Sequence, residues 1–327
     1  MFNWASIFTE MPVLDEIGAT LGRQLSLPYL PGHLQTIAYS FGVFTMIYIV
    51  SALTSPFIAP GTYPKLPRRT KHSWNVHAVS MAHAIVIGPM AAHRLLTLPE
   101  VGSSEKAFGW NESMGLLHGI AVGFVWDTIE SVLAQVEIGF IIHGLACTLI
   151  FGLSYRPFMA FYGPSALVWE ISTPFLNSKI QRSFLGRKLS HIFPRLCFSS
   201  LVCLLLNKQA KCCDHSYWIR YLDKLQMTGG PLQAINGFIL LGLFFTVRVC
   251  YGLYMSFDFF QTLLAVHGSI PIGLTLTYGL GNIALNVLNL FWFTKMIAAL
   301  RKRFQKGDPG ANLPNGNTRA TKKFRSE

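Results

Sequence analysis

The chain has 327 residues, of which 51% are hydrophobic and only 13% are charged. Soluble domains carry roughly a quarter charged residues, so this composition excludes an ordinary soluble fold. The formal net charge of +12 would suit nucleic-acid binding, but much of it flanks hydrophobic blocks, which favours a membrane protein that contacts no nucleic acid.

Seven apolar blocks come close to the length of about 20 residues that a transmembrane helix needs. The expected spans are residues 33–59, 74–98, 114–134, 138–155, 158–176, 231–257 and 272–300. They predict an all-α fold, a polytopic transmembrane helical bundle of about seven spans, because helices satisfy every backbone polar group in lipid. The block at 189–206 is also apolar, but Arg195 and Pro194 weaken it, and we expect a cytosolic or interfacial segment there.

The distribution of basic residues predicts the orientation of the bundle. Four lysines and arginines occur in each of three short segments, 65–71, 179–188 and 301–306. With seven crossings, all three segments fall on the same side of the membrane. The positive-inside rule then predicts a lumenal N-terminus and a cytosolic C-terminus.

These boundaries predict four regions along the chain. They are an N-terminal lumenal segment (1–32), the first span with its loop (33–69), the main membrane domain (70–300) and a basic cytosolic tail (301–327). Within the main domain, residues 183–220 are interpreted as a doubtful insert, because four of the six cysteines fall there and an apolar run disturbs the topology. The hypotheses are a lineage-specific insertion, a retained intron or an ordinary interfacial helix. A predominant transcript that encodes the whole segment would exclude the intron.

Three neighbouring expected spans carry the ionisable side chains Asp127, Glu130, His143 and Glu170. A charge at the centre of a membrane helix costs about 2.5–3.5 kcal/mol on insertion scales. Such residues must therefore face the interior of the protein or a watery cavity. We expect Asp127, His143 and Glu170 to form one polar site inside the bundle.

Glycines at every fourth position, Gly115, Gly119 and Gly123, form a ridge whose next step is Asp127. Small residues let another helix approach closely, so the ridge could join copies of this chain or a different partner in an oligomer. Asp127 is then either a structural acid bonded to a neighbouring group or a functional acid. His143 is likewise either an interhelical bond or a proton-transfer group.

The last span carries an inward stripe of polar residues, Tyr278, Asn282, Asn286 and Asn289. This stripe either bonds neighbouring helices together or forms one wall of a headgroup pocket. The histidines do not follow the HxxxH or HxxHH spacing of membrane di-iron enzymes, and HExxH, GxSxG and P-loop patterns do not occur, so we expect no metal site.

Three segments in order resemble a known family. They are FVWDTIES, which contains the acid, IGFIIHGLACTLIFGLSYRPF, which contains the histidine, and YGPSALVWEISTPFLN. This order resembles the TLC domain of ceramide synthases and translocating-chain-associating proteins. The WEISTPFLN segment is most similar to the ELSTPFLN of the uncharacterised TLC domain-containing branch. The resemblance covers roughly residues 70–300.

The resemblance implies an endoplasmic-reticulum protein that acts in lipid homeostasis, binding membrane lipids or regulating their composition, without a cofactor. The polar site would include Glu130, Glu170, Asn177, Asn282 and Asn286. The alternative is an acyl-CoA-dependent N-acyltransferase on a sphingoid-type lipid, with acyl-CoA as co-substrate; a translocon accessory is a third idea.

In the acyltransferase alternative, His143 would be the base and Asp127 its partner. Ceramide synthases carry two adjacent histidines, of which His143 matches one. Gly144 occupies the neighbouring position in this chain, which favours lipid binding over acyl transfer.

Overall fold

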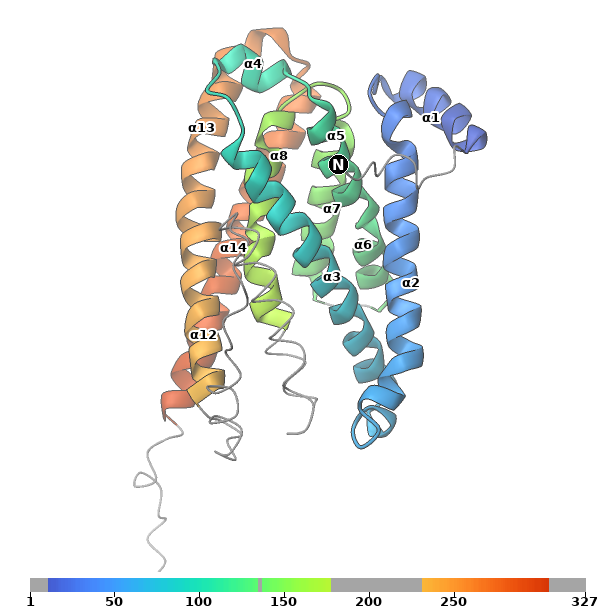
Figure 1. Cartoon of the computed structure of the whole chain (residues 1–327). Helices are drawn as coiled ribbons and strands as arrows, with labels where there is room; N and C mark the ends of the chain where they lie inside the picture. Colours follow the sequence, from blue (N-terminus) through green and yellow to red (C-terminus); the bar gives the residue numbers. More distant parts are fainter. Residues whose placement is uncertain (1–10, 135–136, 178–230, 306–327) are drawn as a thin grey trace, which may run out of the picture.

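The computed structural model describes residues 11–134, 137–177 and 231–305. All regular elements within these ranges are helices, and none is a strand. Five helices are long and apolar enough to cross a membrane, namely Pro31–Ile58, Arg68–Leu96, Glu112–Leu133, Ile235–Ser269 and Ile272–Ala299. The predicted all-α membrane bundle is therefore confirmed (Figure 1).

The N-terminal part contains a helix that the sequence analysis did not anticipate, α1 (Pro12–Leu25). It leans across the end of α2 (Leu34–Ile58) in Figure 1, with the short η2 (Pro31–His33) between them. Gly18 and Gly22 allow this close approach, since a Cβ at either position would lie 3.1 Å from Pro31. After η3 (Tyr63–Lys65), α3 (Arg68–Leu96) returns beside α2.

The predicted third span is divided into two helices. After α4 (Ser103–Phe108), α5 (Glu112–Gly123) begins at Asn111, whose side chain accepts from the Ser113 amide at 2.9 Å. Phe124 interrupts the helix, and α6 (Val125–Leu133) continues it.

The glycine ridge of α5 is covered by α2 of the same chain. A Cβ on Gly119 would lie 2.9 Å from Thr36, and one on Gly123 would overlap Ser40. The ridge thus provides packing within one chain, and an oligomer contact through it stays a prediction.

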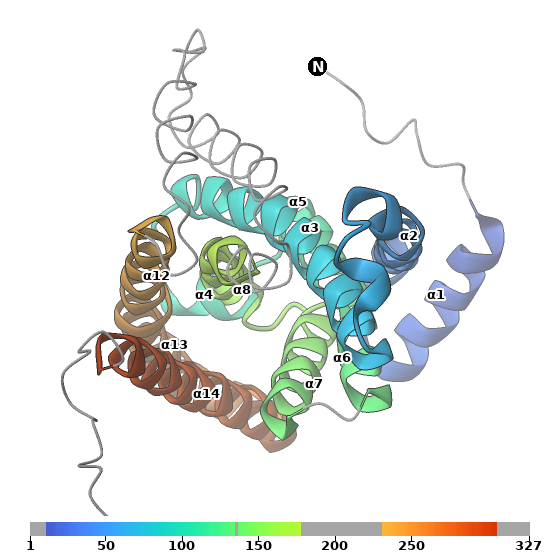
Figure 2. The same ribbon diagram turned by 90° about the horizontal axis from the view of Figure 1, so that it is seen from below.

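The chain between α7 (Ile138–Leu153) and residue 177 differs from the expected regular span. It consists of η4 (Ala160–Tyr162), α8 (Gly163–Leu167), η5 (Val168–Ser172) and a further helical turn. Trp169 and Ser172 are buried. Figure 2 shows α8 enclosed by a ring of longer helices. Protein rather than lipid therefore surrounds this irregular segment, as its backbone requires.

Of the last two crossings, the first is longer than expected and the second, Ile272–Ala299, agrees with the expected span 272–300. The first comprises α12 (Pro231–Leu243), the π-helix η6 (Phe244–Cys250) and α13 (Tyr251–Val266), so it extends beyond the predicted end at residue 257. After η7 (His267–Ser269), α14 (Ile272–Gln305) runs back. The beginning of α3 and the end of α14 lie at the same end of the bundle (Figure 1). The segment 183–220 lies outside the described residues.

Candidate functional site: a polar cavity inside the bundle

The bundle contains a cavity of about 1430 Å³ that is partly open, lined by residues of α3, α5, α6, α7, the segment 163–177, η6, α13 and α14. Typical small-molecule pockets measure roughly 300–1,000 Å³, so this one is large enough for a lipid. Basic side chains occur at the end where α3 begins, and they include Arg68 and Lys71. Lys295 of α14 also lines the cavity.

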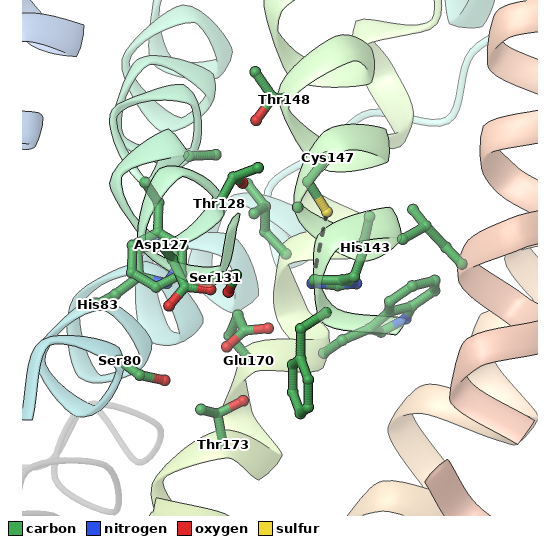
Figure 3. A pocket seen from close by; sticks show the side chains of 18 of the residues that line it. Ser80, His83, Asp127, Thr128, Ser131, His143, Cys147, Thr148, Glu170 and Thr173 are labelled. Carbon is green, nitrogen blue, oxygen red and sulfur yellow. Dashed lines mark hydrogen bonds between the residues drawn. The ribbon is translucent and has the colours of Figure 1, made fainter. Parts of the chain in front are cut away.

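The structure brings most of the predicted site residues to this cavity. The predicted residues that line it are Asp127, Glu130, His143, Glu170, Asn177 and Asn282. Figure 3 shows Asp127, His143 and Glu170 around one space. Asn286 is the exception, because its Nδ2 donates to Ser256 Oγ at 2.7 Å and joins α14 to α13. It therefore connects helices, as one of the two interpretations of the asparagine stripe proposed.

Asp127 and His143 share the cavity without a bond between them. The Asp127 carboxylate has no hydrogen-bond or ion-pair partner within the described part of the chain. His143 Nε2 lies 3.7 Å from the sulfur of Cys147, which is one turn further along α7. The rings of His143 and Trp292 form an edge-to-face contact with their centroids 5.5 Å apart. The proposed base, His143, and the proposed acid, Asp127, are therefore not bonded to each other in this structure.

Glu170 forms an ion pair with Arg248, a residue to which the sequence analysis gave no role. Arg248 Nη2 lies 3.0 Å from Glu170 Oε1. The guanidinium also donates to the Trp169 carbonyl at 3.1 Å and to side chains of three other residues, Ser172, Thr173 and Asn289. The sequence does contain a signal for this ion pair, because an arginine inside an apolar span needs a partner.

Arg248 lies on the π-helix η6, and π-helical turns often occur at functional sites. The ion pair fixes the irregular segment against this turn. Asn289, the last residue of the predicted stripe, accepts from the guanidinium at 3.4 Å. Glu170 is thus held in place while 18% of its side chain remains exposed.

Glu130 is paired as well, but with α3. Its Oε1 approaches His72 Nε2 at 2.5 Å, and the Tyr48 hydroxyl contacts the other ring nitrogen at 2.8 Å. Of the three acids that line the cavity, Asp127 is thus the one without a partner in the described residues.

Besides His72, three further histidines that the sequence analysis did not assign to the site line the cavity, namely His77, His83 and His118. His83 of α3 is 4% exposed, and neither of its ring nitrogens has a hydrogen-bond partner in the part of the chain that the structure describes. His118 of α5 is fully buried, and its Nδ1 contacts Ser154 Oγ at 2.7 Å. Among the described residues, no group of three or more His, Cys, Asp or Glu side chains could hold a metal ion.

The family model of the TLC domain matches residues 73–298. The chain belongs to the TLC domain family. Its resemblance to that family is therefore confirmed. The matched region contains every residue of the cavity discussed above except Tyr48, Arg68, Lys71 and His72.

Relatives of this TLC domain protein match most of its length. An uncharacterised TLC domain-containing protein of Schizosaccharomyces pombe is 32% identical over 294 residues, which is 89% of this chain and 86% of the relative. Topoisomerase I damage affected protein 4 of Saccharomyces cerevisiae is 25% identical, covering 86% and 88%. TLC domain-containing protein 4 of Homo sapiens is 22% identical, covering 79% and 85%. No solved structure matches this chain.

The position beside His143 has a packing role in this TLC domain protein. A Cβ on Gly144 would overlap the hydroxyl of Thr128 on α6. Glycine thus allows α6 and α7 to approach each other closely at this position.

Proposed function

We propose that this protein binds a membrane lipid in the cavity and acts in lipid homeostasis, as a multi-pass protein of the endoplasmic reticulum. The observation that carries the proposal is the cavity itself, about 1430 Å³ with apolar walls and a polar centre inside a membrane bundle. Charged groups persist at membrane depth where they have partners or a function. Asp127 has no partner among the described residues, which supports a function.

The lining of the cavity suits an amphiphilic ligand. Arg68 and Lys71 occupy one end, while Phe151, Leu167 and Leu285 contribute apolar surface. The acids and histidines line the same cavity. A lipid with an anionic head would place its head at the basic end and its chains against the apolar walls.

Acyl transfer receives less support from the arrangement. His143 has no bonded carboxylate in the described residues, and Gly144 packs against Thr128 where a second histidine would stand. A catalytic base is typically oriented by a third group that bonds to it, and among the described residues no carboxylate does this for His143. Incubation of the purified protein with acyl-CoA and a sphingoid base measures this alternative directly, and N-acylated product would establish it.

The proposal is tested by comparing lipid composition and protein abundance in the same cells. We expect at least one of Asp127→Asn, His143→Ala and Glu170→Gln to alter the lipid profile at normal abundance. Asp258→Asn is the matched control, because Asp258 pairs with Lys106 at 2.8 Å and does not line the cavity. Unchanged lipids with all three cavity variants at full expression would refute the proposal.

A further inference from the structure

His83 brings two unused hydrogen-bonding atoms to the wall of the cavity. A neutral imidazole has one donor and one acceptor nitrogen, and neither nitrogen of His83 has a partner in the described chain, although the residue is 4% exposed. Buried polar groups in folded proteins almost always have a partner. At a cavity wall, a molecule inside the cavity can supply this partner.

The surrounding aromatic rings hold His83 in a fixed orientation. Its ring stacks on that of Phe124, with the ring centroids 4.0 Å apart and an angle of 4° between the planes. It also forms an edge-to-face contact with Phe44, with the ring centroids 5.6 Å apart. Phenylalanine could make both contacts equally well. Packing alone therefore does not explain a histidine at this position.

His83 borders the same polar region as His143 and Glu170. Helix α3 passes close to the irregular segment, since a Cβ on Gly88 would lie 3.2 Å from Ile171 and 3.7 Å from the Glu170 carbonyl carbon. His83 of α3, His143 of α7 and Glu170 of the irregular segment all line the cavity. Figure 3 shows the side chains of His83 and His143 on opposite sides of Glu170.

We propose that His83 is a ligand-contacting residue that hydrogen-bonds the uncharged polar linkage of a bound lipid. The linkage is an ester, amide or hydroxyl group between the head and the acyl chains. This follows from the chemistry of the imidazole, which offers a donor to a carbonyl and an acceptor to a hydroxyl or amide. The charged head of the lipid stays at the basic end with Arg68 and Lys71. The inference rests on the proposed function and names the part of the lipid that this residue recognises.

The test uses cells fed a photoactivatable fatty acid with an alkyne tag, which enters their lipids and is cross-linked to the protein by light. Labelling is counted on the peptides that line the cavity. We expect His83→Phe to reduce this labelling about fivefold, the effect of losing one hydrogen bond. His83→Gln should retain most of it, because the amide keeps a donor and an acceptor. His93→Phe on the exposed side of the same helix should have no effect.

Thermal stability provides the second measurement. Purified His83→Phe in detergent should melt at the same temperature as the wild type or higher, because an unpartnered buried polar group is removed while the ring contacts remain. Unchanged labelling of His83→Phe, or its failure to fold, would overturn the role of His83. Absence of labelling on the wild-type cavity peptides would instead refute lipid binding itself, so the two failures are distinguishable.

Discussion

Removal of the Arg248 guanidinium should strongly destabilise the protein. Arg248→Met keeps much of the side-chain volume but leaves Glu170 as a buried charge without its partner. It also removes donors from the Trp169 carbonyl and from the oxygens of Ser172 and Asn289. Breaking a buried ion pair on one side costs about 3–5 kcal/mol. Since each kcal/mol corresponds to roughly 2–4 °C in proteins of this size, the melting temperature should fall by on the order of 10 °C.

A second substitution separates the loss of the pair from the loss of packing. In Arg248→Met with Glu170→Gln, the unpaired charge is absent, so the double variant should be more stable than Arg248→Met alone. Arg248→Lys should lie between the wild type and Arg248→Met, because an ammonium group cannot reproduce the planar fork of donors.

The melting temperature is measured by heating the protein in detergent and determining, by size-exclusion chromatography, the fraction that remains monodisperse. A melting temperature of Arg248→Met within about 2 °C of the wild type, where a loss near 10 °C is expected, would refute the structural role of the pair. A double variant that melts below Arg248→Met would show that the cost does not arise from the buried charge of Glu170.

Three further predictions concern packing and topology. Gly144→His should cost about 1–3 kcal/mol of stability through overlap with Thr128, and Thr128→Ala should recover part of this loss in melting temperature. Gly163→Ala should cost a similar amount because its Cβ would overlap the His118 ring, whereas Gly152→Ala, with open space around it, should leave the melting temperature unchanged or higher. In sealed microsomes, protease should digest a C-terminal tag and spare an N-terminal one; a protected C-terminal tag would reject the predicted orientation.

The regular spans were predictable because length and hydropathy alone determine them. The expected spans 33–59 and 138–155 agree closely with Pro31–Ile58 and with α7. The expected end of the sixth span at 257 was wrong because Asp258 resembles a boundary. In the structure, Lys106 of α4 neutralises Asp258 at 2.8 Å, and the helix continues to Val266.

The site was predictable in its charges but not in their partners. An acid within an apolar span is too costly to face lipid. The sequence therefore predicted that Asp127 and Glu170 face inward, and both line the cavity. The partner of Glu170 lies 78 residues away in the sequence, and no local pattern connects the two. His83 was overlooked because its role depends on the absence of any partner around it, which only the packed structure reveals.

The pairing of Glu170 with Arg248 has a consequence for how the protein is inserted into the membrane during synthesis. Ribosomes produce Glu170 78 residues before its counter-ion. Until Arg248 is made, the segment 163–177 carries an acid without this partner, at a cost of about 2.5–3.5 kcal/mol in lipid. Its short helices are also too irregular to expose their backbone to lipid. We therefore expect this segment to stay at the insertion machinery and to enter the bilayer only together with η6, before α14 completes the bundle.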